Sequence, residues 1–99
     1  MSQKQDMLIF VDIRSSFEEW KALFDQDYDM RSEMSDAENT IVTKVDDKNA
    51  MVFMPAVDME KMQQRFAAME AGSDPNAKLV REHVNAHNVY LASRMPAPQ

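Results

Sequence analysis

Two apolar runs constrain the fold of this chain more than any other feature. MLIFVDI at 7–13 and AMVFMPAV at 50–57 are apolar almost throughout, without the alternation of a strand that has one wet face. Such runs are typical of strands buried on both faces. The two other predicted strands, TIVTKV at 40–45 and VNAHNVYLAS at 84–93, mix polar and apolar residues. We therefore expect a sheet in which 7–13 and 50–57 are the central strands.

A first helix follows the first strand. Ser16, with Glu19 three residues later, forms a capping-box pattern at its start. Apolar residues then recur at helical spacing and predict one buried face. They are Phe17, Trp20, Leu23 and Phe24.

Two more helices are expected between the strands at 50–57 and 84–93. Asp58 is the predicted N-cap of the longer one, and Gly72, the only glycine of the chain, is its predicted end. A shorter helix is predicted within 73–83, with Asp74 as N-cap and Pro75 in its first position. The apolar stripe of the longer helix consists of Met59, Met62, Phe66 and Met69.

The predicted order is β-α-β-β-α-β, a ferredoxin-like α+β fold with a four-stranded antiparallel sheet. DDKN at 46–49 supplies the turn of a hairpin, and Pro55 is expected at a strand end or bulge. We expect one domain over 7–94, an N-terminal tail at 1–6 and a C-terminal tail at 95–99. Two helices cover one face of such a sheet, so the second apolar face predicts a homodimer that packs sheet against sheet.

Composition excludes several classes of function. The net charge is −6 and the 99 residues contain no cysteine, so neither nucleic-acid binding nor disulfides are expected. The N-terminal apolar run is too short for a membrane span, which predicts a cytoplasmic protein without a membrane partner. Ten methionines suit either a core filler or an adaptable apolar pocket.

Two segments, SSFEEWKALFDQDYDMR and KVDDKNAMVFMPAVDMEKMQQRF, carry a family resemblance. They resemble small bacterial proteins of the dimeric α/β-barrel superfamily, in the group related to antibiotic-biosynthesis monooxygenases. The shared features are Trp-Lys, Phe-Asp and Met-Arg along the first helix, an Asp-rich turn, an apolar strand and an Asp at the next helix start. The resemblance covers residues 7–93 and implies a ligand site between the helices and the sheet of each subunit. Related chains often have a glycine after the first helix, where SEMSDAEN has none.

Asp27 and Arg31 are the first candidate site residues. At about 100° per residue, both project into the apolar arc of the first helix, and their spacing of four allows them to pair. Either the helix loosens around Gln26 and rotates the pair outward, or the two residues pair at the rim of the core. Alternatively, the pair lies at a pocket mouth, where Arg31 is free to bind a carboxylate or enolate, or it belongs to a subunit interface.

His87 is the candidate general base. Asn85, interpreted as lying on the same strand face, and Arg31 are the candidate anion stabilisers. Trp20, Phe24 and Tyr90 are expected to line the core first and a ligand pocket second. His83 and His87 have no third ligand at a metal-like spacing, so neither a metal nor another cofactor is expected.

Three functions fit this pattern. The first is a protein that binds a small apolar or aromatic molecule. The second is a cofactor-independent monooxygenase or isomerase, which the family resemblance implies. The third is a structural or partner-binding dimer without a cavity. A cavity under about 100 Å³ would remove the first two, since pockets for drug-sized ligands are about 300 Å³ or larger.

Overall fold

The structure is a computed structural model that describes residues 4–92. Residues 4–6, predicted as part of a tail, belong to the first strand, while 1–3 and the predicted C-terminal tail lie outside the described residues. The elements in chain order are β1 (Lys4–Ile13), α1 (Phe17–Gln26), α2 (Tyr28–Ser32), the 3₁₀ helix η1 (Ala37–Asn39), β2 (Ile41–Asp46), β3 (Asn49–Asp58), α3 (Met59–Ala71), α4 (Ala77–His83) and β4 (Val84–Ala92).

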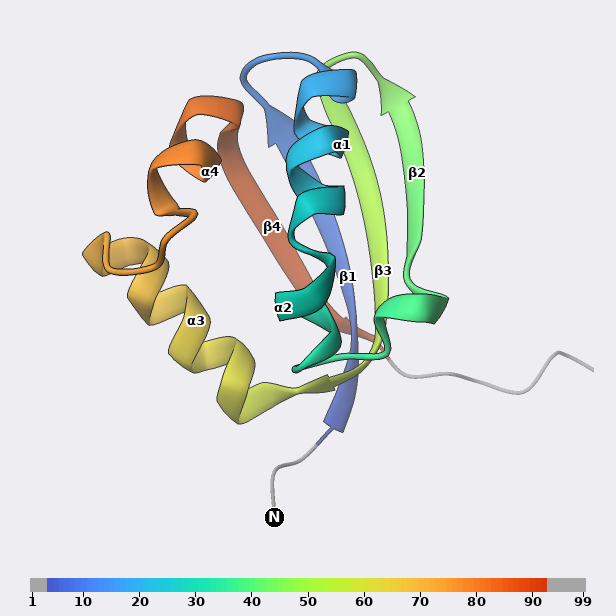
Figure 1. Cartoon of the computed structure of the whole chain (residues 1–99). Helices are drawn as coiled ribbons and strands as arrows, with labels where there is room; N and C mark the ends of the chain where they lie inside the picture. The colour runs from blue at the N-terminus through green and yellow to red at the C-terminus, as the bar shows by residue number, and fades with distance from the viewer. Residues whose placement is uncertain (1–3, 93–99) are drawn as a thin grey trace, which may run out of the picture.

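The fold is α+β, with an open four-stranded antiparallel sheet in the order β2-β3-β1-β4. The prediction that the strands at 7–13 and 50–57 are central is confirmed. The helices gather on one side of the sheet, with α3 and α4 toward the β4 edge (Figure 1). The first connection holds α1 and α2 where one helix was expected, so the chain does not follow the simple β-α-β-β-α-β order. Within residues 4–92, no helix is long and apolar enough to cross a membrane.

The core lies between the helices and one face of β1 and β3. Alternate residues of a strand point to opposite faces, and here one set is buried under the helices. This core is completed by Trp20 of α1, by Met62 of α3 and by Met34, which follows α2. The buried strand residues are Met7, Ile9, Val11 and Ile13 of β1 and Ala50, Val52, Met54 and Val57 of β3.

The opposite side of the sheet carries two rows of residues that run across all four strands, and we call it the open face. In the first row every member is apolar or aromatic; in the second a polar residue lies at each end. Isolated apolar residues on a surface are ordinary, but a continuous strip across a sheet marks an interaction surface. The rows are Ile41–Phe53–Leu8–Tyr90 and Thr43–Met51–Phe10–Asn88.

Two bulges interrupt the alternation. Between Met54 and Val57, β3 has one residue more than β1, so Pro55 lies at a bulge as predicted, and Ala56 takes a positive φ of 52°. In β4 the register shifts opposite Asp12 and Ile13, which leaves Asn85 as the extra residue. A bulge reverses the face on which later residues lie relative to the earlier ones.

Most of the predicted caps are confirmed. Ser16 Oγ accepts from Glu19 N at 3.2 Å, Asp58 Oδ1 accepts from Lys61 N at 3.2 Å, and Gly72 ends α3 with a φ of 77°. The predicted start of α4 is wrong. Its N-cap is Asn76, and the buried Asp74 accepts from the Asn76 backbone at 2.8 Å in the turn that precedes the helix.

Candidate functional site

The first helical segment breaks at Asp27, which separates α1 from α2. Its φ of −85° and ψ of 6° lie outside helical geometry, so the apolar arc of α1 does not continue directly into α2. The expectation that the helix loosens near Gln26 is confirmed. The charges do not turn outward, however: Arg31 is only 5% exposed.

Asp27 joins α1 to both helices of the second connection. Its carboxylate accepts two hydrogen bonds from the Arg65 guanidinium of α3, both at 2.6 Å, and one from the Asn76 side chain at 3.0 Å. Arg65 Nε also donates to Asp74 at 3.3 Å. Burial alone would lower the pKa of Arg65, but its hydrogen bonds and charge interaction with Asp27 outweigh that effect and raise it. The predicted pairing of Asp27 with Arg31 is therefore wrong, because Arg65 occupies the carboxylate.

Arg31 has fewer partners. Its guanidinium lies over the Phe24 ring, with Cζ 3.7 Å from the ring centre, and Nη2 donates to the Phe24 carbonyl at 3.0 Å. Among the described residues, Nε of Arg31 has no hydrogen-bond partner although it is buried. Burial lowers the pKa of Arg31, and the nearby Asp27 charge acts against this shift. The side chain thus carries a buried charge with most of its donors unused.

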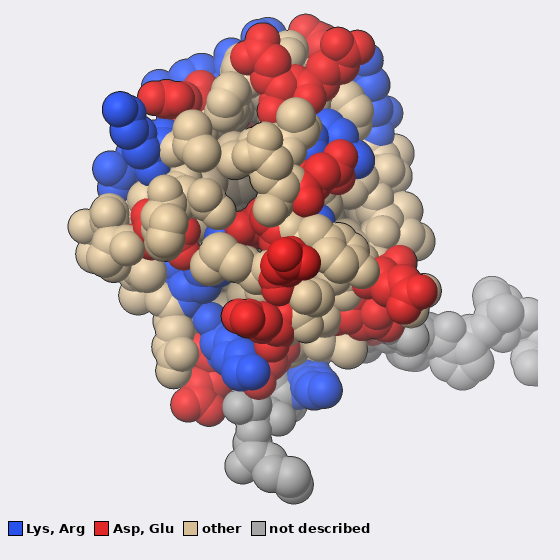
Figure 2. Space-filling view, viewed as in Figure 1, with Lys and Arg blue, Asp and Glu red and all other residues tan. Residues whose placement is uncertain are grey.

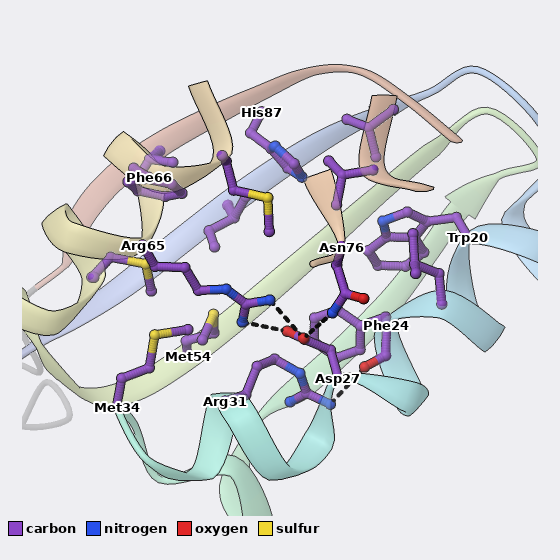
Figure 3. Close-up of a pocket in the computed structure, with 17 residues that line it drawn as sticks. Trp20, Phe24, Asp27, Arg31, Met34, Met54, Arg65, Phe66, Asn76 and His87 are labelled. Atoms are coloured by element: carbon purple, nitrogen blue, oxygen red, sulfur yellow. Dashed lines mark hydrogen bonds and ion pairs between the residues drawn. The ribbon is translucent and has the colours of Figure 1, made fainter. Parts of the chain in front are cut away.

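A cavity of about 180 Å³ lies between the helices and the sheet, above this charged cluster (Figure 3). Figure 2 shows the corresponding face, where basic and acidic side chains are interspersed and uncharged ones surround a recess. The lining is mostly apolar and aromatic. It consists of Ile9, Trp20, Leu23, Phe24, Asp27, Arg31, Met34, Met54, Met62, Arg65, Phe66, Met69, Asn76, Val80, Val84, His87 and Val89.

His87 reaches the cavity from β4, on the side away from the Asp27 cluster (Figure 3). The residue is exposed at the mouth, but its ring lies against the apolar lining. The resulting loss of solvent lowers the pKa of His87 below its usual value. At neutral pH the imidazole is therefore uncharged and able to accept a proton.

The structure brings five of the predicted site residues to this cavity: Trp20, Phe24, Asp27, Arg31 and His87. The placement of Asn85 beside His87 is wrong, because Asn85 is itself the extra residue of the bulge in β4. Asn85 accepts from Arg14 at 2.8 Å and donates to Asp12 at 3.2 Å, outside the cavity. Tyr90 is also outside it, on the open face, with its ring edge against Phe10.

Sequence reasoning missed the role of α3 and its neighbours Asp74 and Asn76. The sequence signal for Arg65 is weak: at about 100° per residue it projects about 40° beyond Met69, next to the edge of the apolar stripe of α3. Of that stripe only Met62 is fully buried, while Phe66 and Met69 line the cavity. An arginine beside an apolar stripe has a mostly buried partner in this case, because Asp27 binds Arg65.

A second hollow, of about 370 Å³, lies on the other side of Phe24 and Arg31, between α1 and β2. It is more polar, and the exposed Lys21–Asp25 pair borders it. No group of three or more His, Cys, Asp or Glu side chains within residues 4–92 is arranged to hold a metal ion. His83 is bound locally, with Nδ1 2.6 Å from Ser15 Oγ.

No protein-family model matches this chain, and neither a curated protein nor a solved structure matches it.

Proposed function

We propose that this protein binds a small aromatic molecule in the cavity between its helices and its sheet. The observation that carries the proposal is a cavity of about 180 Å³ with an apolar lining and convergent polar groups at one end. A dry apolar cavity of about 150 Å³ accommodates benzene. The ligand is therefore one aromatic ring with a small substituent, below the usual drug-sized range of about 300 Å³ and more.

Methionine methyl groups provide a direct test. Met34, Met54, Met62 and Met69 line the cavity, whereas Met51 lies on the open face. With ¹³C-methyl-labelled methionine, toluene should shift the four lining signals and leave the Met51 signal unchanged. A shift of Met51 alone would place binding on the sheet surface, and no shift at all would contradict the proposal.

A variant that fills the cavity sharpens this test. Val89→Phe adds a ring to the lining from β4 and should abolish the toluene shifts. Leu91→Phe is the matched control, because Leu91 is two residues along the same strand, 62% exposed and outside the lining. Retained shifts in Val89→Phe would show that toluene binds elsewhere.

The position of His87 favours one alternative, a cofactor-independent monooxygenase or isomerase. A neutral imidazole at the cavity mouth could take a proton from an enolisable aromatic substrate, with Arg31 near the anion that forms. Exchange of the acidic C–H of such a compound in D₂O, followed by NMR, tests this step. The exchange should fall to the buffer rate in His87→Gln, and an unchanged rate in that variant would exclude His87 as the base.

We also propose that the chain is a ferredoxin-like unit of a dimeric α/β barrel, with two copies packed through their open faces. The apolar row Ile41–Phe53–Leu8–Tyr90 supports this, since a two-fold axis pairs such a row with itself. Native mass spectrometry should show a dimer, together with any retained ligand.

Phe10→Glu should yield monomers, because it places a charge in the centre of the open face. Tyr28→Glu is the matched control, since this exposed aromatic residue lies on α2. A wild-type monomer in dilute solution would refute the barrel assembly. A dimer without toluene binding would favour the purely structural alternative.

A further inference from the structure

Arg31 is a buried cation whose hydrogen-bonding capacity is largely unused. The side chain is 5% exposed, and within residues 4–92 its five N–H donors make one hydrogen bond, from Nη2 to the Phe24 carbonyl at 3.0 Å. Its Nε is shielded and has no partner among the described residues. Buried donors are nearly always paired, so an unpaired one on a residue that lines a cavity requires an explanation, and an acceptor bound in the cavity is one.

The neighbouring carboxylates are already bound to other donors. Asp27 accepts from both terminal nitrogens of Arg65 and from Asn76, and Asp74 accepts from Arg65 Nε. Asp27 offsets part of the Arg31 charge through space, but the hydrogen bonds of its oxygens go to α3 and α4. Neither Asp27 nor Asp74 therefore hydrogen-bonds Arg31, and within residues 4–92 the free donors are left to a molecule that enters the cavity.

The side chains around Arg31 indicate which kind of molecule carries this acceptor group. The Arg31 guanidinium lies over the Phe24 ring, and the same cavity is lined by Trp20, Phe66 and methionine side chains (Figure 3). A carboxylate is the acceptor that matches the planar fork of an arginine. Methionine side chains are flexible enough to move aside for it.

We infer that the cavity binds a single-ring aromatic carboxylate, with its ring among Trp20, Phe24 and Phe66 and its carboxylate on Arg31. This inference rests on the proposed function and adds the charge and the head group of the ligand. It also gives Arg31 the role of a specificity-determining residue.

Benzoate, benzamide and benzylamine test the inference, because they share a ring and differ in the charge of the head group. Trp20 is the only tryptophan and lines this cavity but not the second hollow, so its emission reports binding at the proposed site. Wild-type protein should bind benzoate about tenfold more tightly than benzamide, since only the carboxylate carries a charge opposite to the guanidinium and can accept two parallel hydrogen bonds from it. Benzylamine should bind least.

Arg31→Met should remove the preference for benzoate over benzamide, while Arg14→Met, an equal loss of charge at an exposed position outside the cavity, should keep it. If Arg31→Met does not fold, the comparison of the three ligands on wild-type protein still tests the inference.

Equal binding of benzoate and benzamide, or tightest binding of benzylamine, overturns the inference. Binding of benzoate that calorimetry detects without a change in Trp20 emission also overturns the inference, because it places the anion outside this cavity. Toluene shifts without a preference for benzoate would refute this inference alone, whereas failure of all these compounds, toluene included, would refute the proposed function as well.

Discussion

Replacing Asp27 by alanine should lower the free energy of unfolding by about 3 kcal/mol. The Asp27 and Arg65 side chains are only 15% and 12% exposed, and two hydrogen bonds of 2.6 Å join them. Removing one partner of a buried ion pair costs about 3–5 kcal/mol, and the residual exposure places this pair at the low end. In a domain of this size, 3 kcal/mol corresponds to a fall in Tm of about 15 °C.

Urea denaturation followed by circular dichroism measures this loss. Asp25→Ala is the matched control, because Asp25 lies two residues earlier and pairs with Lys21 at 2.7 Å on the exposed side of α1. That pair is an exposed i,i+4 contact, and its loss should cost less than about 0.5 kcal/mol. Equal losses in Asp27→Ala and Asp25→Ala would refute the argument and place Asp27 in a solvated rim.

The remaining predictions concern caps, backbone strain and pH. Asp58→Ala should cost about 1 kcal/mol in urea denaturation through loss of the α3 cap, and a change within error would contradict the cap. Gly72→Ala should lower the free energy of unfolding by about 1 kcal/mol, because Gly72 has a φ of 77° that alanine adopts only with strain. Ala56→Gly should leave the free energy of unfolding unchanged or raise it, because Ala56 already has a positive φ of 52°. The opposite signs would refute the presence of backbone strain at these two positions. Burial lowers the pKa of His87, so the folded state binds fewer protons than the unfolded state. Stability should therefore fall as pH decreases from about 7.5 to about 5.5, and the fall should be smaller in His87→Gln; equal slopes would contradict this.

The architecture of the sheet could be predicted because its signals are local. The runs at 7–13 and 50–57 lack alternation, and only central strands of a sheet with two apolar faces require that pattern. Ser16, Asp58 and Gly72 were predictable for the same reason, since a cap acts within one turn of its own helix. In the sequence, the only sign that the first helix divides at Asp27 is that charged residues lie where the helical periodicity predicts apolar ones.

The site could be predicted on the first helix, but not on α3, and only in part on β4. Asp27 and Arg31 stood out because they interrupt an apolar arc, but the partner of Asp27 is 38 positions away, on α3. Local spacing favoured Arg31 as that partner, and tertiary packing selected Arg65. On β4, alternation placed Asn85 beside His87, and a single bulge opposite β1 separated them. A bulge arises from the pairing of two strands, so the sequence of one strand does not reveal it.

The contacts of Asp27 also bear on how fast the folded protein is lost. Its hydrogen bonds reach residues 38 and 49 positions further along the chain, so they close large loops and form only after α3 and α4 have docked. Interactions made after the rate-limiting step of folding slow unfolding without accelerating folding. A protein without this carboxylate should therefore refold at nearly the normal rate and unfold much faster. The Asp27 side chain then determines how long the folded protein lasts, and has little effect on whether the chain reaches the native fold.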